Sequence, residues 1–177
     1  QPAIRRNLNK YNPILTDMVD SSQIPQVMKE RYRFNEDERF YKHHGVDIKR
    51  TLGATGKWLL SKVGIGSSNY GGSTITQQVI KKYNNEKENT PSRKVKEMMR
   101  AVALEKQLTK DEILTMYLNI VNFANNCNGV EAAANTYFNK DASALTLAEA
   151  ASIAGITQFP SEYDPFVHPD KNIENVI

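Results

Sequence analysis

The sequence predicts one mainly α-helical domain, arranged as two lobes around a cleft. Apolar residues recur at spacings of three and four along most of the chain, which is the period of an amphipathic helix. Serine and threonine repeatedly precede such stretches, where they cap helices. The alternation of apolar and polar residues that indicates strands is nearly absent. At 177 residues the chain is long enough to bury a sizeable core as one domain.

Capping residues and apolar spacing together place the individual helices. The expected helices cover residues 47–63, 74–83, 91–108, 110–121, 129–138, 147–156 and 171–177. The expected caps are Asp47, Ser73, Thr90 with Pro91 behind it, Thr109 with Glu112, and Thr146 with Glu149.

Three further segments carry structural expectations. The helix over 91–108 has an apolar stripe, made of Val95, Met98, Met99 and Val102. The glycines and serines of 62–72 predict a flexible loop. Asn119 and the asparagine-rich run ahead of Gly129 predict a packed turn with a structural role.

Charge is distributed unevenly along the chain. Residues 1–100 carry 19 Lys and Arg against 10 Asp and Glu, whereas residues 101–177 carry 4 against 10. This asymmetry indicates that the first part faces an anionic partner, or else presents a solvated basic face. Cys127 is the only cysteine, which excludes an intrachain disulfide and a thiolate metal cluster. No apolar run is long enough to span a bilayer. The chain stops inside a predicted helix, KNIENVI, so we expect an excised domain whose anchor or neighbours are missing.

The first polar group is NEDERFYKHHGVD, residues 35–47. Adjacent acids repel each other, which suits one of Glu36 and Asp37 to act as a general base. His43 and His44 point in different directions on a helix, so a zinc site is disfavoured. The alternative is an exposed acidic loop in which His43 is hydrogen-bonded structurally.

The second group is GGSTITQQVIKK, residues 71–82. Glycines let a backbone approach a ligand, and the free N–H groups of a helix start favour anions. Gln77 and Lys81 lie one turn apart, as do Gln78 and Lys82, which suits a sugar that carries phosphate. The alternative is an elaborate cap on a surface helix. It is not a Walker loop, because the lysine is too far from the glycines.

The third group is SRKVKE, residues 92–97. Arg93 and Glu97 are four residues apart and can pair on one helix face, with Lys94 and Lys96 alongside. The alternative is a solvated face with one weak ion pair.

In this order, these groups resemble the family 51 glycosyltransferase domain of class A penicillin-binding proteins and monofunctional transglycosylases. The resemblance extends over about residues 27 to 170, and IAGITQFPSEYDP (153–165) is a looser version of a fifth motif. The matching residues are Glu36-Asp37-x-x-Phe40-x-x-His43-x-Gly45, Gly72-Ser73-Thr74-Ile75-Thr76-Gln77-Gln78, Arg93-Lys94-x-x-Glu97 and Ile113-Leu114-x-x-Tyr117-Leu118-Asn119.

The resemblance implies a lysozyme-like helical fold with a larger lobe and a smaller, membrane-dipping one. It implies that lipid II is polymerised into β-1,4 glycan with inversion, and that lipid pyrophosphate is the leaving group. Glu36 would be the general base, and Glu97 a second acid that positions groups or a divalent ion, Mg²⁺ or Mn²⁺, without an organic cofactor. The residues implied to bind substrate are Asp37, Phe40, His43, Gly72, Ser73, Thr74, Thr76, Gln77, Gln78, Lys81, Arg93 and Lys94.

The partners implied are lipid II, the growing glycan, a membrane surface, and a transpeptidase domain or other wall-synthesis proteins, but not nucleic acid. The site would lie on the extracytoplasmic face of the bacterial membrane, with the apolar residues of 58–63 in the lipid interface. Gly53 and Asn89 stand where this family usually has arginines, which puts phosphate binding in doubt unless Arg50, Lys57 or Lys87 substitutes. Two alternatives therefore stay open: a lysozyme-like lytic enzyme, and a non-catalytic module that binds precursor or scaffolds wall synthesis.

Overall fold

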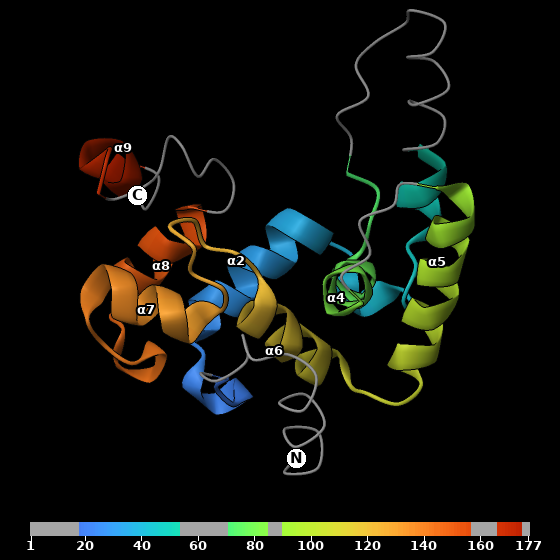
Figure 1. The fold of residues 1–177 in the computed structure, drawn as a ribbon, viewed down its shortest axis with the longest axis horizontal. Helices are drawn as coiled ribbons and strands as arrows, with labels where there is room; N and C mark the ends of the chain where they lie inside the picture. Colours follow the sequence, from blue (N-terminus) through green and yellow to red (C-terminus); the bar gives the residue numbers. More distant parts are fainter. Residues whose placement is uncertain (1–17, 54–70, 85–89, 157–165, 175–177) are drawn as a thin grey trace, which may run out of the picture. The chain divides into compact units, whose positions relative to one another are not determined.

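The structure, a computed structural model, describes residues 18–53, 71–84, 90–156 and 166–174. The chain divides into two compact units, one made of Gln1–Tyr32 with Thr115–Ile177 and the other of Arg33–Leu114. Over the described residues the secondary structure is helical, with one isolated bridge between Asn122 and Asn128 and no strand (Figure 1). The predicted mainly α-helical fold is confirmed.

The unit Arg33–Leu114 contains the three polar groups that the sequence singles out. Its elements are the end of α2 (Gln26–Asp37), η2 (Phe40–Lys42), helical residues 48–53, α4 (Ile75–Tyr83), α5 (Pro91–Glu105) and the start of α6 (Lys110–Ile120). Within it α4 packs against α5. The helix α2 was missing from the sequence prediction, which treated residues 35–47 as one polar group. Met28 and Tyr32, four residues apart and both buried, are the apolar signal that indicates it.

The helix α4 begins one residue later than predicted. Thr74, rather than Ser73, is its N-cap: the hydroxyl of Thr74 accepts a hydrogen bond from the Gln77 N–H at 3.2 Å. In return the side-chain oxygen of Gln77 accepts one from the Thr74 N–H at 3.1 Å, which completes a capping box. Ser73 is thereby left outside the helix, and its hydroxyl accepts a hydrogen bond from Lys94.

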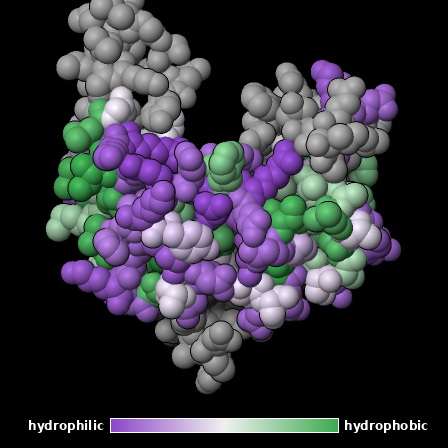
Figure 2. All heavy atoms as spheres, turned by 180° about the vertical axis from the view of Figure 1, so that it is seen from behind, coloured by the Kyte–Doolittle hydropathy of each residue, from purple (hydrophilic) through white to green (hydrophobic). Residues whose placement is uncertain are grey.

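The helix α5 confirms its predicted cap, because the Thr90 hydroxyl accepts from the Arg93 N–H and Pro91 stands in the first turn. The helix ends at Glu105, three residues before the predicted end. Its burial is the reverse of the predicted stripe: Arg93, Glu97 and Ala101 are buried, whereas Val95 is 57% and Met99 is 68% exposed. Apolar residues accordingly gather along the edge where α5 runs (Figure 2, left). Polar residues can occupy the inner face because they are hydrogen-bonded to each other and to α4.

The second unit contains η1 (Ser21–Gln23), the later residues of α6, α7 (Val130–Phe138), η3 (Ala142–Ala144), α8 (Leu147–Ile156) and α9 (Pro169–Glu174). In it α8 packs against both α7 and α9. Tyr32 meets Tyr117 and Phe123 edge to face, with ring centroids 6.0 and 5.7 Å apart. The capping boxes at Thr109 and Thr146 form as predicted.

Asn119 and the turn after α6 have the structural role that the sequence predicts. The amide of Asn119 accepts from the Val19 N–H and donates to the Val19 carbonyl, both at 2.9 Å. Gly129 has φ +95°, and a Cβ there would lie 2.5 Å from the Asn119 carbonyl oxygen. Only glycine fits that position, because a side chain would meet backbone.

Several expectations lie outside the described residues. They are the continuation of the helix after 53, most of the loop 62–72, the apolar residues of 58–63, Lys57, Lys87, the position of Asn89, and 157–165 of the fifth motif. Within the described part of the chain, no helix is both long enough and apolar enough to cross a membrane.

Candidate active site

The first motif fixes the start of α4. Asp37, fully buried at the end of α2, accepts a hydrogen bond from the Ile75 N–H at 3.0 Å through Oδ2. The same oxygen lies 2.9 Å from Nε2 of His43, which is also buried. The hydroxyl of Thr74 donates to the Gly45 carbonyl at 2.7 Å. The expectation of a hydrogen-bonded His43 is confirmed, whereas the alternative of an exposed acidic loop is wrong for Asp37.

Gly45 and Phe40 allow the first motif to pack closely against its neighbours. Gly45 has φ +88°, and a Cβ there would lie 2.6 Å from the carbonyl carbon of Ala101 in α5. Phe40 is 0% exposed, and its ring lies edge-on to His43 with centroids 6.1 Å apart. The motif therefore sets the spacing between the end of α2, α4 and α5.

Glu36, beside Asp37, is oriented differently and is partly exposed. Its Oε2 accepts a hydrogen bond from the side-chain amide of Gln78 at 2.9 Å. Among the described residues, no hydrogen-bond donor meets its other oxygen. Lys82 lies one turn beyond Gln78. Partial burial and, to a smaller extent, the charge of Lys81 lower the pKa of Lys82, whereas the Glu36 carboxylate acts to raise it. Glu36 thus has one oxygen held and one available.

Glu97 gathers the polar side chains of the second and third motifs. Its Oε2 accepts from Arg93 at 2.5 Å, and its Oε1 accepts from Lys94 at 2.5 Å and from Gln77 at 3.2 Å. The Glu97 side chain is 1% exposed and that of Arg93 is 9% exposed. The i,i+4 pairing is confirmed, and the alternative of a solvated face is wrong for these two residues.

This arrangement does not suit Glu97 as a metal ligand. Divalent cations such as Mg²⁺ take carboxylate oxygens together with several waters. Both oxygens of Glu97 already accept hydrogen bonds, and two of the three donors are cations. Over the described ranges, no group of three or more His, Cys, Asp or Glu is placed to hold a metal ion.

The helix start is largely satisfied from within the protein. The N–H groups of Thr74, Ile75 and Gln77 donate to Gln77, Asp37 and Thr74 respectively, and Thr74, Ile75, Thr76 and Gln77 are all 0% exposed. Gly72 and Ser73 are partly exposed, and so is Gln78. Lys81 is exposed in the last turn of α4, about 10 Å along the axis from Thr74. Direct phosphate contact at this helix start therefore stays a prediction, and it rests on Ser73, Gln78 and Lys81.

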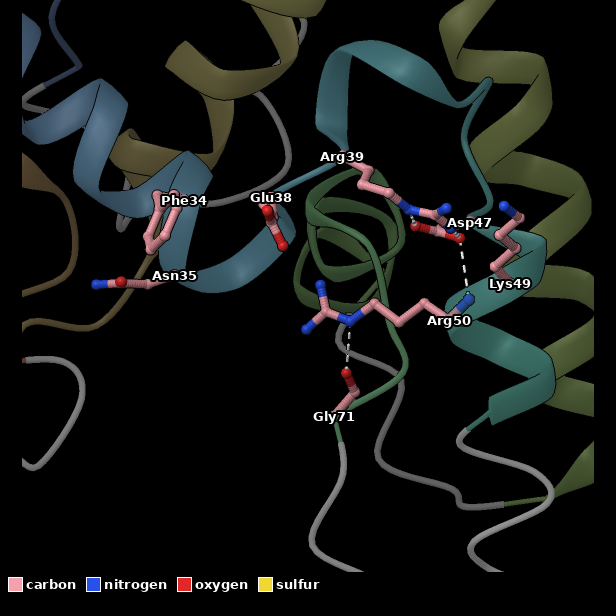
Figure 3. A pocket seen from close by; sticks show the side chains of 8 residues that line it. All are labelled: Phe34, Asn35, Glu38, Arg39, Asp47, Lys49, Arg50 and Gly71. Atoms are coloured by element: carbon pink, nitrogen blue, oxygen red, sulfur yellow. Dashed lines mark hydrogen bonds and ion pairs between the residues drawn. The ribbon is translucent and has the colours of Figure 1, made fainter.

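Beside Glu36 lies a hollow of about 460 Å³, lined by Phe34, Asn35, Glu38, Arg39, Asp47, Lys49, Arg50 and Gly71 (Figure 3). Arg50 lies along it, donating from Nε to the Gly71 carbonyl at 2.9 Å and from a terminal nitrogen to the main-chain carbonyl of Glu36. Arg39 grips Asp47 with two nitrogens. Burial acts to raise the pKa of Asp47, but the hydrogen bonds from Arg39 and from the Arg50 N–H outweigh it, so this pKa lies below its usual value.

Sequence reasoning missed three residues of this unit that contact the motifs. Glu105 accepts from the Thr76 hydroxyl at 2.5 Å and from Lys110 at 2.7 Å. Arg50 was expected only as a substitute for the arginines missing at positions 53 and 89, not as a partner of the Glu36 backbone. The available signal was the position of Glu105 and Lys110 at the two ends of the short α5–α6 connection, where side chains come close together.

Comparison with known proteins places this arrangement in a family. The Transglycosylase family model matches residues 5–176. The chain is 46% identical over 154 residues to penicillin-binding protein 1A of Clostridium botulinum, covering 87% of this chain and 19% of that protein. It is 41% identical over 156 residues to penicillin-binding protein 1F of Bacillus subtilis, covering 88% and 21%. It is 42% identical over 167 residues to penicillin-binding protein 1A of Pseudomonas aeruginosa, covering 94% and 20%.

The helical fold and the hydrogen-bonded motifs thus define a transglycosylase-type domain. The chain belongs to the transglycosylase family. It spans about a fifth of the length of the curated relatives that it matches.

Proposed function

We propose that this chain is a peptidoglycan glycosyltransferase that polymerises lipid II into β-1,4 glycan strands. The observation that carries the proposal is the pairing of two consecutive α4 side chains with the two acids: Gln77 with Glu97, and Gln78 with Glu36. Consecutive helical residues point about 100° apart, so one helix holds the two acids of separate motifs in a fixed relation. The family membership supports the same activity.

In the proposed reaction, Glu36 is the general base. Its unbonded oxygen takes the proton from the acceptor's 4-hydroxyl as that oxygen attacks the anomeric carbon of the donor. The bond from this carbon to the lipid diphosphate breaks, and the diphosphate leaves with the electron pair. A single displacement of this kind inverts the anomeric carbon without a covalent sugar intermediate.

Because diphosphate is a good leaving group, the chief requirement is for cations and hydrogen-bond donors placed to meet its growing negative charge. An ammonium group has three N–H donors, and Lys94 gives two of them to Ser73 and Glu97. The third is left for a ligand, and the Lys94 side chain is 34% exposed. We assign diphosphate contact to Lys94, Ser73 and the exposed Lys81, with buried Arg93 behind them.

Glu97 in this proposal is the counter-charge that holds Arg93, Lys94 and Gln77 in place. A divalent ion, where the reaction needs one, would accompany the diphosphate rather than bind Glu97, and we derive no step through it. Besides Arg93, the buried members of the predicted substrate set are Asp37, Phe40, His43, Thr74, Thr76 and Gln77, and these six are assigned to positioning.

A lytic enzyme is less well supported. Glycoside hydrolysis of this type needs a carboxylic acid that carries a proton and reaches the glycosidic oxygen. Glu97 is 1% exposed and its oxygens already accept from Arg93, Lys94 and Gln77, so it is badly placed for that role. Cutting a neutral glycosidic bond also has no use for a cation cluster.

The remaining proposals concern the cellular location of the protein and its partners. We propose that the protein acts at the extracytoplasmic face of the bacterial cytoplasmic membrane and is part of a longer, anchored protein that includes a transpeptidase domain or meets other wall-synthesis proteins. The basic balance of residues 1–100 is consistent with an anionic membrane surface and an anionic substrate.

The test is incubation of the protein with purified lipid II in detergent, followed by separation of the products by size. Polymer that muramidase cuts to disaccharide units supports the proposal. Cleavage of preformed glycan without polymerisation would establish the lytic alternative, and lipid II binding without turnover the scaffold alternative.

The matched pair of variants is Glu36→Gln and Glu30→Gln, both on α2. We expect Glu36→Gln to lower the polymerisation rate by roughly 10²- to 10⁴-fold, the usual contribution of a general base. Glu30 is exposed, and its replacement should leave the rate unchanged. Normal polymerisation by Glu36→Gln would overturn the base assignment.

A further inference from the structure

Glu105, the last residue of α5, places its carboxylate among three polar groups. Its Oε1 accepts from the Thr76 hydroxyl at 2.5 Å and from the Lys110 ammonium at 2.7 Å, and lies 4.0 Å from Nδ1 of His43. The Glu105 side chain is 4% exposed. Each of these partners belongs to a different element, so the buried carboxylate of Glu105 links several elements of the unit.

Lys110 compensates the buried charge of Glu105. It is the first residue of α6, and its ammonium lies both 2.7 Å from Glu105 and 4.4 Å from the centre of the Phe40 ring. The cation is therefore held by a carboxylate on one side and an aromatic face on another. Without it, Glu105 would be an uncompensated charge in a nearly closed environment.

Two acids consequently hold the first two residues of α4. Asp37 accepts the main-chain N–H of Ile75 at 3.0 Å, and Glu105 accepts the hydroxyl of Thr76 at 2.5 Å. Bonds to two neighbouring residues, from acids on different elements, fix the rotation of a helix about its own axis as well as its position. Gln78 lies half a turn beyond Thr76 on the same helix, so the rotation of α4 determines the direction of the Gln78 side chain.

We propose that the part-buried Glu105–Lys110 pair is a positioning pair for the base, acting through Thr76 and α4 on the Gln78 amide that holds Glu36. The catalytic part of this inference rests on the proposed function. Neither Glu105 nor Lys110 touches substrate in this scheme. Their effect is on where Glu36 sits relative to the acceptor hydroxyl.

A direct substrate role for Thr76 would give a different pattern. If Thr76 bound substrate, removal of its hydroxyl would raise KM. If it only supported the fold, its removal would lower thermal stability without a specific effect at Gln78. The positioning role lowers kcat with little change in KM and changes the environment of the Gln78 amide.

The test compares Thr76→Val, which removes the hydroxyl at nearly constant shape, with Thr76→Ser, which keeps it. Glu105→Gln keeps an acceptor for Thr76 but removes the charge facing Lys110. The control is Glu149→Gln, which breaks a Lys–Glu pair with the same 2.7 Å separation in the other unit. The readouts are kcat and KM with lipid II, and the NMR signal of the Gln78 side-chain amide, identified by its loss in Gln78→Leu.

We expect Thr76→Val and Glu105→Gln to lower kcat on the order of ten- to a hundredfold with KM within about twofold, as for a small misplacement of a reacting group. The Gln78 signal should shift in both variants, return to its wild-type position in Thr76→Ser and stay unmoved in the control.

An unmoved Gln78 signal in Thr76→Val, or a rise in KM instead of a fall in kcat, would overturn the inference. Should Glu105→Gln not fold, Thr76→Val decides alone. If the wild type does not polymerise lipid II, the proposed function fails. The Gln78 signal still tests whether Glu105 and Thr76 determine the position of the Gln78 amide.

Discussion

The side-chain amide of Gln78 donates a hydrogen bond to Oε2 of Glu36, with a nitrogen–oxygen distance of 2.9 Å. This bond orients the proposed base from a neighbouring helix instead of from its own. One oxygen of Glu36 is thereby fixed, which also sets the direction of the other.

The first prediction follows from this bond. Gln78→Leu should lower kcat for lipid II polymerisation by about tenfold or more, because Glu36 loses the donor that orients it, and a hydrogen bond to a charged group is worth about 1.5–3 kcal/mol. Steady-state kinetics measures this. Gln107→Leu, exposed beyond the end of α5, is the control and should match the wild type. Unchanged kcat in Gln78→Leu would show that Glu36 does not need this partner.

The second prediction concerns Glu97 and divalent ions. Glu97→Gln should lower polymerisation strongly, because Arg93 and Lys94 lose their shared counter-charge. Whatever rate remains should show the same half-saturating Mg²⁺ or Mn²⁺ concentration as the wild type. A metal titration of both proteins, after chelation with EDTA, provides the comparison. A large increase in the metal requirement of Glu97→Gln would instead make Glu97 a metal ligand.

The third prediction concerns Arg50, which bonds the main-chain carbonyls of Gly71 and Glu36. Arg50→Lys keeps the charge, but an ammonium cannot reproduce the planar fork that reaches both carbonyls. We expect Arg50→Lys and Arg50→Ala to lower kcat/KM similarly, by about tenfold for 1.4 kcal/mol of lost interaction. Lys49→Ala, on the same hollow, tests charge alone. If Arg50→Lys kept full activity, charge rather than geometry would be the contribution of Arg50.

The fourth prediction uses two glycines as a matched pair. Gly45→Ala should destabilise the protein, because φ is +88° and the new Cβ would lie 2.6 Å from the Ala101 backbone. At 2–4 °C per kcal/mol for a chain of this size, a cost of about 2 kcal/mol lowers Tm by roughly 4–8 °C. At Gly53 a Cβ meets nothing within 4 Å, so Gly53→Ala should leave Tm equal or raise it. Thermal unfolding measures both, and equal effects would contradict the close approach at Gly45.

The fifth prediction is a pH dependence of stability. The hydrogen bonds from Lys140 and from the Thr146 N–H lower the pKa of Glu149 from 4.5 to about 2. A carboxylate whose pKa is lowered by folding stabilises the protein above its unfolded pKa, and this contribution disappears as the pH falls through the folded pKa. Denaturant unfolding should therefore show Glu149→Gln less stable than the wild type at neutral pH. The difference should shrink as the pH falls from 4.5 toward 2, and a constant difference would contradict the pKa shift.

Capping was the most predictable feature of the fold. The pairs Thr109 with Glu112 and Thr146 with Glu149 form as expected because both partners lie within four residues, so that the sequence contains the whole interaction. The choice between Ser73 and Thr74 as the cap of α4 was not local. Thr74 also donates to the Gly45 carbonyl, 29 residues away, and Ser73 accepts from Lys94.

Burial was the least predictable feature. The apolar spacing in α5 predicted a buried stripe, whereas Arg93 and Glu97 face inward and Met99 is 68% exposed. The inner face of α5 is polar because α4 presents Gln77 to it, and a helix pattern contains no information about its neighbour. Glu105 was overlooked for the same reason, since nothing near it in sequence indicates that Thr76 and His43 lie beside it.

By itself, the sequence determined the helical fold class, most helix starts and the polar motifs that resemble the glycosyltransferase family, because these depend on short-range spacing and residue type. Only the tertiary structure decided which motif residues are buried supports and which are accessible. It joined Glu36 to Gln78, Glu97 to Gln77, and Glu105 to Thr76, between segments 20 or more residues apart. Such contacts follow from packing, where a hydrogen bond between distant residues forms once the helices have come together.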